Sequence, residues 1–323
     1  MASFVPVEAL FVVAAIGAFG QAAERYPAPG RLIDVGGRKI HLFCTGKGSP
    51  TVVLLAGGSA FAIDWALVQP QIAKKTRVCS YDRAGLGWSG SGPADETVEQ
   101  TVSDLHDVLR LPPEKGPFVL VGASIGGIFI RAYQHAFPEE VAALVFTNST
   151  GRVGMALPGG KGGLLWELSE DALRSVFPLP ASAKGKAPTA EGEPFDRLPE
   201  DLQIVRLWLD VRLWEQFDPA KSNPTSMLSW RKEFLREFDE TEDPDAFPLG
   251  KLPVVVLASG PEATKAERQT RNTASARLDH LSANSVHLVA KGSGHEIHLY
   301  QPDRVGEAIS LALAAVRDGK PLN

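Results

Sequence analysis

The sequence predicts an α/β fold with a largely parallel sheet and helices on both faces. Short apolar runs typical of buried strands alternate with helical patterns along most of the chain. A Gly-x-Ser-x-Gly turn at 122–126 separates one such strand from a helix. The alternation stops for about a hundred residues between Asn148 and Lys251 and then resumes. These observations indicate one α/β core interrupted by an insertion.

Composition excludes several classes of protein. With 323 residues, 44% of them hydrophobic, the chain can bury a large core. A net charge of -5 gives no basic footprint for nucleic acid, so no nucleic-acid partner is expected. The two cysteines, Cys44 and Cys79, are too few for a disulfide scaffold and fit no metal-ligand spacing. We therefore predict no metal site and two small core residues.

The first 30 residues form a separate apolar segment. Residues 9–20 are all apolar or glycine, with Glu8 before them instead of a basic residue. This run is too short to span a bilayer unless 4–23 is counted as one segment. Three interpretations stay open: a membrane anchor or interfacial helix, a signal peptide, or a helix packed on the protein. Localisation stays open with them, between membrane-associated, exported and cytoplasmic.

The expected elements follow in order from residue 31. A hairpin with a Gly36-Gly37 turn comes first. Strands are predicted at 31–35, 38–44, 51–55, 77–82, 118–121, 141–147, 252–258 and 285–290. Helices are predicted at 64–73, 98–110, 128–136, 263–281 and 303–317. In such sheets the reactive groups gather at the carboxyl ends of the strands.

The insertion at 149–250 is rich in glycine, proline and aromatic residues within helical patterns. It predicts a helical cap over the sheet. We expect most of its large aromatic residues to form the cap's own small core. They are Trp166, Trp208, Trp214, Trp230, Phe234 and Phe238.

Ser124 is the candidate nucleophile. It lies in the tight turn between Gly122 and Gly126, which lifts a serine hydroxyl off the end of the sheet and lets strand and helix pack closely. A serine nucleophile needs a base. His295 follows the last predicted strand, so its loop lies at the same edge of the sheet. The other six histidines are not at the reactive ends of strands.

Four motifs carry a family resemblance, which extends from about residue 31 to 317. They are Leu55-Ala-Gly-Gly58, the run 81–89 (Tyr-Asp-Arg-Ala-Gly-Leu-Gly-Trp-Ser), Gly122-Ala-Ser-Ile-Gly126, and the run 294–302 beginning Gly-His-Glu. The chain resembles α/β-hydrolase enzymes of the esterase/lipase type, with a cap like those of haloalkane dehalogenases and epoxide hydrolases. The resemblance implies a mostly parallel eight-stranded sheet, a core of 31–148 and 251–323, and a cap at 149–250.

The resemblance also assigns roles to individual residues. Ser124 is the expected nucleophile and His295 the general base, and the backbone amides of Gly58 and Ile125 form the expected oxyanion hole. Glycine at 58 lets the backbone approach a developing oxyanion, and fixed amide donors stabilise that charge. Asp82 and Arg83 match a motif that is usually structural. Dehalogenases and epoxide hydrolases of this fold use aspartate as nucleophile, whereas serine indicates acyl transfer.

The third member of the triad departs from the family pattern. The position after the strand before the cap holds Asn148, which can accept a hydrogen bond from the histidine through its amide oxygen but supplies no charge. After the strand behind the cap, Glu262 is the nearest carboxylate, and the more usual position holds Ala263. The candidates are therefore Glu262 as the acid, Asn148 as a weakened orienting residue, or an unidentified acid; Asp279 is too distant.

The family's strand order places the strands that carry Cys44 and Cys79 side by side. This permits a disulfide in an exported protein, although we take reduced core thiols as the expectation.

The leading hypothesis is a serine hydrolase that cleaves a carboxylic ester of a small apolar substrate through an acyl-enzyme intermediate, in an apolar pocket between sheet and cap. No cofactor is expected. One alternative is carbon–carbon bond hydrolysis or perhydrolysis by the same Ser124 and His295 pair. Another is a slow-turnover binding or receptor protein on the same fold. This alternative stays open because Asn148 stands in the usual position of the acid. Membrane association through the N-terminal segment is a further hypothesis.

Overall fold

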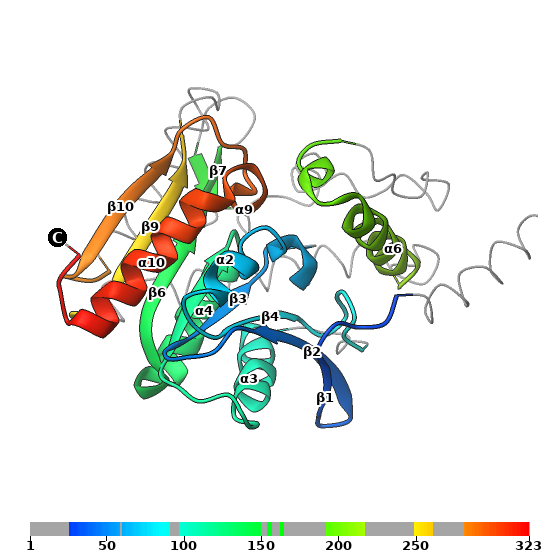
Figure 1. Ribbon diagram of the computed structural model, residues 1–323, viewed down its shortest axis with the longest axis horizontal. Helices are drawn as coiled ribbons and strands as arrows, with labels where there is room; N and C mark the ends of the chain where they lie inside the picture. Colours follow the sequence, from blue (N-terminus) through cyan, green and yellow to red (C-terminus); the bar gives the residue numbers. More distant parts are fainter. Residues whose placement is uncertain are drawn as a thin grey trace, which may run out of the picture.

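An eight-stranded sheet forms the centre of the protein in the computed structural model (Figure 1). The structure describes residues 26–58, 60–90, 97–149, 154–156, 162–164, 192–216, 249–260 and 281–322. Strand order is β1-β2-β4-β3-β5-β6-β9-β10. The strands are β1 Arg31–Val35, β2 Arg38–Thr45, β3 Thr51–Leu55, β4 Val78–Asp82, β5 Phe118–Ala123, β6 Val141–Thr147, β9 Val254–Ser259 and β10 Ser285–Ala290. β2 is antiparallel to β1 and β4 on either side of it, and the other pairs of this sheet are parallel, which confirms the mostly parallel sheet.

The burial of each strand follows its place in the sheet. β3, β4 and β5 lie in the middle and are buried at every position, as the continuous apolar run of β3 predicts for that strand. The edge strand β1 is exposed at three of its five positions. The central strands therefore carry the core.

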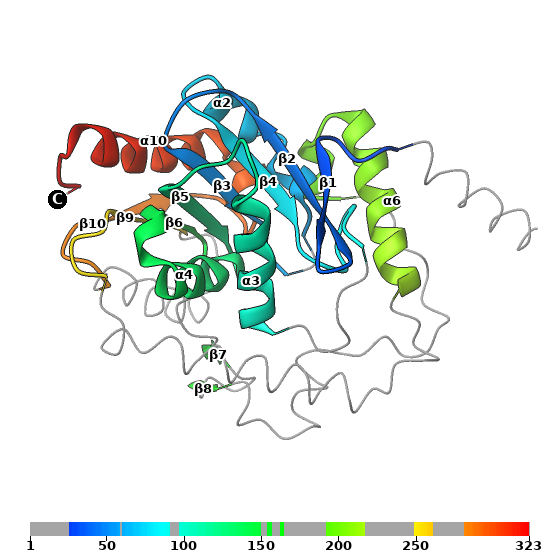
Figure 2. The ribbon, with the colours of Figure 1, turned by 90° about the horizontal axis from the view of Figure 1, so that it is seen from below.

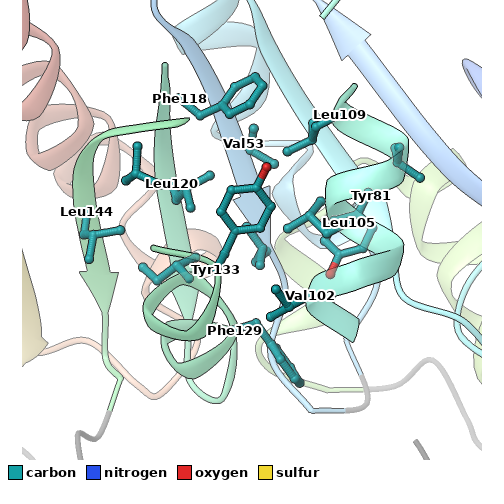
Figure 3. Close-up of a cluster of buried hydrophobic side chains, with 14 of the residues drawn as sticks. Val53, Tyr81, Val102, Leu105, Leu109, Phe118, Leu120, Phe129, Tyr133 and Leu144 are labelled. Carbon is teal, nitrogen blue, oxygen red and sulfur yellow. The ribbon is translucent and has the colours of Figure 1, made fainter. Parts of the chain in front are cut away.

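Helices cover the two faces of the sheet (Figure 2). α3 (Val98–Leu109) and α4 (Gly126–Ala136) pack on one face, where Leu105 and Tyr133 meet Val53 and Leu120 of the strands (Figure 3). α2 (Gln69–Ala73) and α10 (Pro302–Asp318) cover the other face. The two apolar clusters hold the sheet between two helical layers.

One predicted helix differs in detail from the structure. The predicted helix 64–73 is divided into η1 (Ala62–Trp65) and α2, because Pro70 lacks an amide proton and fits only the first turn of a new helix. Two short elements were not predicted: α9 (Ile297–Tyr300) and η2 (Pro138–Glu140). The predicted helix 263–281 lies outside the described residues.

α6 (Glu200–Gln216) and η4 (Phe195–Arg197) belong to the predicted cap. Trp208 of α6 packs on Trp88, with ring centroids 6.3 Å apart, and on Tyr26 at 5.7 Å. The aromatic partners of Trp208 thus lie outside 149–250, although Leu202, Val205 and Leu213 of α6 belong to the same apolar cluster, so the expectation for most of the set stays a prediction. The rest of that aromatic set lies outside the described side chains.

α6 is also held by an ion pair. Arg206 donates to the buried Asp64 of η1 over 2.7 Å, and its guanidinium lies 4.2 Å from the centroid of the Phe61 ring. Burial raises the pKa of Asp64, against the opposing effect of Arg206. The described part of the insertion is thus fastened to the segment that follows β3.

The insertion also contains two short strands that the sequence did not predict. β7 (Gly154–Ala156) and β8 (Gly162–Leu164) pair antiparallel and form a sheet of their own. A glycine-rich strand of three residues shows no alternation of apolar and polar side chains, so the sequence gives no signal for it. The domain boundaries at 30, 148 and 250 stay predictions.

Cys44 and Cys79 form a disulfide bond, so the expectation of reduced thiols is wrong. The antiparallel register of β2 and β4 places the two residues directly opposite each other, with Cα atoms 4.0 Å apart. A Glu114 oxygen lies within 4.8 Å of both sulfurs. Bonded sulfurs are not thiolates, however, and thiolates are the form that ligates metals.

No helix in the part of the chain that the structure describes is long and apolar enough to cross a membrane. The N-terminal apolar segment lies outside those residues, so its three interpretations stay open.

Candidate functional site

Ser124 lies at the junction of β5 and α4. Its φ of 52° is in the left-handed region, which few residues other than glycine adopt. Its amide donates to Thr147 O over 3.1 Å, and its carbonyl accepts from Gly127 N at 3.1 Å. The side chain is half-buried. The strained turn that the sequence predicts is therefore present, held by backbone hydrogen bonds on both sides.

Close packing makes two glycines of this turn necessary. A Cβ at Gly122 would lie 2.5 Å from backbone atoms of Gly126, and one at Gly126 would lie 2.5 Å from Leu55 O. Both contacts are shorter than any that real Cβ atoms make. The glycines thus allow α4 to begin directly above β3 and β5, with its N-terminal dipole beside Ser124.

The turn after β3 faces this elbow. A Cβ on Gly57 would lie 3.2 Å from Ser124 Cβ, whereas one on Gly58 would meet nothing within 4 Å. Gly57 is therefore the glycine that packs against the elbow, and the oxyanion role of Gly58 stays a prediction. Gly58 itself is exposed, and Ile125 is the N-cap residue of α4.

Arg83 holds the turn in place. Its guanidinium donates to the carbonyl oxygens of three consecutive residues: to Ala56 at 2.9 Å, to Gly57 at 3.0 Å and to Gly58 at 2.5 Å. The side chain is buried and lies over the Phe129 ring. The C=O and N–H groups of one peptide unit point in opposite directions. Because the carbonyls of this turn face Arg83, the N–H groups between them face away from it. Sequence reasoning classed Arg83 as structural; the available signal was a charged residue directly after a buried strand.

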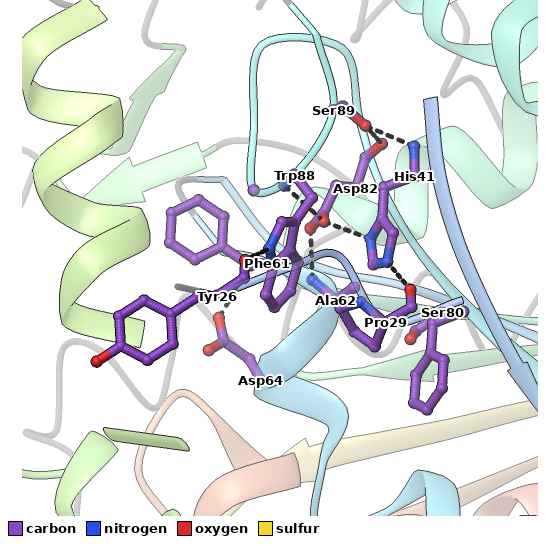
Figure 4. Close-up of polar contacts among 12 residues, drawn as sticks. Tyr26, Pro29, His41, Phe61, Ala62, Asp64, Ser80, Asp82, Trp88 and Ser89 are labelled. Atoms are coloured by element: carbon purple, nitrogen blue, oxygen red, sulfur yellow. Dashed lines mark hydrogen bonds and ion pairs between the residues drawn. The ribbon is translucent and has the colours of Figure 1, made fainter. Parts of the chain in front are cut away.

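Asp82 organises the neighbouring loop (Figure 4). Its buried carboxylate accepts from the amides of Ala62 at 2.7 Å and Trp88 at 3.1 Å, and lies 2.7 Å from His41 Nδ1. His41 and Asp82 are both fully enclosed. This histidine–carboxylate pair supports the loop and has no solvent access, so we leave it out of the candidate site.

Asn148 and His295 meet across the ends of β6 and β10. Asn148 Nδ2 lies 2.9 Å from His295 Nδ1 and donates to the His295 carbonyl over 3.0 Å. Its amide oxygen accepts from Ser259 N at 3.3 Å and Ser259 Oγ at 3.0 Å. The expectation that the amide oxygen faces the histidine is therefore wrong, because that oxygen is engaged by Ser259. Asn148 is buried and has a φ of 46°.

Glu262, the candidate acid, and Asp279 lie outside the described residues. His295 is exposed, whereas its neighbour His298 is buried against Trp65. Burial, with a smaller effect of His295, lowers the pKa of His298 to about 3. His298 is thus neutral at physiological pH.

A cavity of about 640 Å³ lies between β2, η1, α2 and α6. Its walls are largely apolar and include Phe43, Ile63, Trp88 and Leu202. Ser124 is not among its lining residues. The predicted substrate pocket between sheet and cap therefore stays a prediction.

A sequence profile of the alpha/beta hydrolase family matches residues 52–308, about four-fifths of the chain. The chain belongs to this family. The matched region of this alpha/beta hydrolase contains the Ser124 elbow, the turn at 57–58, Asn148 and His295.

Individual relatives of this hydrolase are distant. The uncharacterized protein YqjL of Bacillus subtilis (strain 168) is 24% identical over 282 residues, 86% of this chain and 89% of the relative. A 2-hydroxymuconate semialdehyde hydrolase of Pseudomonas sp. (strain CF600) is 35% identical over 134 residues, 40% of this chain and 47% of that protein. The chain spans less than half the length of several other curated relatives it matches.

Solved structures agree with the fold. A serine hydrolase involved in carbazole degradation superposes with a TM-score of 0.59 and 19% identity, covering 88% of this chain and 98% of the other. At that identity the likeness concerns the fold alone.

Proposed function

We propose that this chain is a serine hydrolase that cleaves a carboxylic ester of a small apolar substrate through an acyl-enzyme intermediate. The observation that carries the proposal is the Ser124 elbow, a strained turn at the carboxyl edge of the sheet with the N-terminus of α4 beside it. Asn148 contacts His295, the candidate base, at the same edge.

The reaction would proceed in two steps. Ser124 Oγ attacks the ester carbonyl carbon, its proton passes to His295 Nε2, and that proton then leaves with the alkoxide as the alcohol. Water next attacks the acyl-enzyme, gives a proton to His295 and releases the acid, and the proton returns to Ser124. The amides of Gly58 and Ile125 would donate to the oxyanion in both steps.

The experiment is ester hydrolysis combined with covalent labelling. Purified protein is assayed on p-nitrophenyl acetate and butyrate, and a fluorophosphonate probe is mapped by mass spectrometry. Labelling at Ser124 and its loss in Ser124→Ala are expected, with Ser103→Ala as control because Ser103 is exposed on α3. A protein that neither hydrolyses these esters nor is labelled at Ser124 would refute the proposal.

Carbon–carbon bond hydrolysis is the second candidate. It is favoured by the names of relatives such as the 2-hydroxymuconate semialdehyde hydrolase and a 2-hydroxy-6-oxo-6-(2'-aminophenyl)hexa-2,4-dienoic acid hydrolase of Metapseudomonas resinovorans. A dienoate of this type turned over much faster than p-nitrophenyl acetate would select it. Perhydrolysis would be recognised if the ester were turned over faster with peroxide present than without it. Binding without turnover of any of these compounds would select the receptor-like alternative.

A further inference from the structure

The amide of Asn148 has a fixed orientation. Its Oδ1 faces the backbone N–H of Ser259 at 3.3 Å, a group that can only donate. Its Nδ2 faces the backbone carbonyl of His295 at 3.0 Å, a group that can only accept. A flipped amide would place two donors together on one side and two acceptors on the other. The orientation therefore follows from two backbone groups and is independent of the imidazole ring.

This orientation determines the proton on the imidazole. With one Nδ2 proton on the His295 carbonyl, the second points at His295 Nδ1, 2.9 Å away. Nδ1 must then accept with its lone pair, so a neutral ring carries its proton on Nε2. The Ser-His-Asp arrangement requires the opposite, with a proton on Nδ1 and the lone pair on Nε2 facing the serine.

We propose that Asn148 holds His295 in the Nε2–H tautomer and so keeps the Ser124 and His295 pair in a resting, weakly basic state. The tautomer assignment stands on the geometry alone, whereas its effect on turnover rests on the proposed function. Asn148 is in this sense a positioning residue that acts through the histidine.

Activation of the pair needs a proton exchange and a turn of the amide. His295 is exposed, so Nε2 can lose its proton to water while Nδ1 takes one from water, which leaves the ring neutral. The new Nδ1–H would face the Asn148 NH2 group. Relief of that contact requires the amide to flip and to lose its hydrogen bonds to Ser259 N and the His295 carbonyl. The flip gives up both of these hydrogen bonds, so the resting arrangement is favoured.

Aspartate at 148 should reverse this preference. A carboxylate can accept from Ser259 N and from His295 Nδ1–H at once, and it supplies the charge that stabilises an imidazolium, which offsets the placing of its second oxygen beside the His295 carbonyl. The left-handed φ of 46° suits aspartate as well as asparagine. Asn284, at the amino end of β10, offers a matched control, since Asn284→Asp adds the same charge away from the site.

The decisive measurement is the ring tautomer of His295. Histidine-labelled protein is studied by two-bond ¹H–¹⁵N NMR at alkaline pH, where imidazole is neutral, and the His295 signals are assigned by their loss in His295→Gln. We expect an Nε2–H pattern in the wild type and in Asn284→Asp, and an Nδ1–H pattern in Asn148→Asp. An Nδ1–H pattern in the wild type, for example from an acid such as Glu262 bound there, would overturn the proposal.

Kinetics then separates this proposal from the proposed function. On p-nitrophenyl acetate, Asn148→Asp is expected to raise kcat at least tenfold, within a ceiling of about 10⁴-fold, the effect of the triad carboxylate in serine proteases. If Ser124 is labelled in the wild type and Asn148→Asp is no faster, the resting-state proposal is wrong and the hydrolase stands. If neither protein is labelled, the hydrolase proposal fails and the NMR result alone decides the tautomer.

A second variant covers the case in which Asn148→Asp does not fold. Asn148→Ala is then examined by the same NMR measurement. If His295 keeps the Nε2–H pattern in Asn148→Ala, Asn148 is not the cause of that tautomer.

Discussion

The carbonyl oxygen of Gly58 accepts a hydrogen bond of 2.5 Å from the guanidinium of Arg83. Through this bond and two others, a side chain at the end of β4 fixes the turn at the end of β3. The geometry of the candidate oxyanion hole therefore depends on a buried residue of another strand end.

Arg83→Lys and Arg83→Met are expected to lower kcat on p-nitrophenyl acetate by roughly 10²-fold, close to the loss of one oxyanion donor, with a smaller change in KM. Lysine lacks the planar fork that serves three acceptors. Arg304→Met is the control, since Arg304 makes an exposed ion pair on α10. A lowered melting temperature with unchanged kcat would mean that Arg83 only stabilises the fold.

Gly126→Ala and Gly58→Ala form a pair with opposite expected outcomes. At Gly126 the new Cβ would lie 2.5 Å from Leu55 O, so we expect a destabilisation of about 2–4 kcal/mol and loss of Ser124 labelling. At Gly58 there is room, and the free energy of unfolding should stay within about 0.5 kcal/mol of the wild type. Urea denaturation measures both; equal destabilisation would contradict the packing described for the elbow.

The main strands were predictable, because strands covered on both faces are continuous apolar runs and the turns between them are marked by glycine. Ser124 was found for the same reason, since it directly follows such a strand, β5, whereas His295 was found from its place in the loop after the last strand, β10. The orientation of the Asn148 amide was not predictable, because it depends on Ser259 and the His295 backbone, 111 and 147 residues away in sequence. The partners of Arg83 and the aromatic partners of Trp208 likewise come from other segments of the chain.

The expectation of reduced cysteines was wrong for a related reason. The residue pattern marks Cys44 and Cys79 as strand positions but does not give the register of the strands, which places them opposite each other. One residue of slippage would turn the two side chains to different faces.

Removal of the disulfide by Cys44→Ala/Cys79→Ala should lower the free energy of unfolding by about 3–4 kcal/mol, because the bond closes a loop between residues separated by 35 positions. Urea denaturation of the oxidised wild type and of the double variant measures the difference. Thiol titration of denatured, unreduced protein should detect no free thiol. Two titratable thiols there would exclude the bond.

His298 should make the protein acid-sensitive. Its pKa is about 3 in the folded state against an ordinary value of 6.5, so the unfolded chain binds the proton more tightly between these values. Stability is therefore lost as pH falls below about 6.5, with a slope approaching about 1.4 kcal/mol per pH unit from this group.

His298→Gln should flatten that slope relative to the wild type, whatever its effect at neutral pH. Urea denaturation between pH 7 and pH 4 measures it, with exposed His287→Gln as control. Parallel slopes in wild type and His298→Gln would show that His298 is not the group responsible.

The Arg206–Asp64 ion pair limits how this protein can be recombined with its relatives. Asp64 belongs to the core, six positions after Gly58, whereas its cation is on α6. A chimera that received residues 149–250 from another hydrolase would retain Asp64 as a buried carboxylate without its cation, which is strongly destabilising. Exchange of the insertion to alter substrate range would therefore succeed only with donors that carry an arginine at the matching helix position, or together with an uncharged residue at 64.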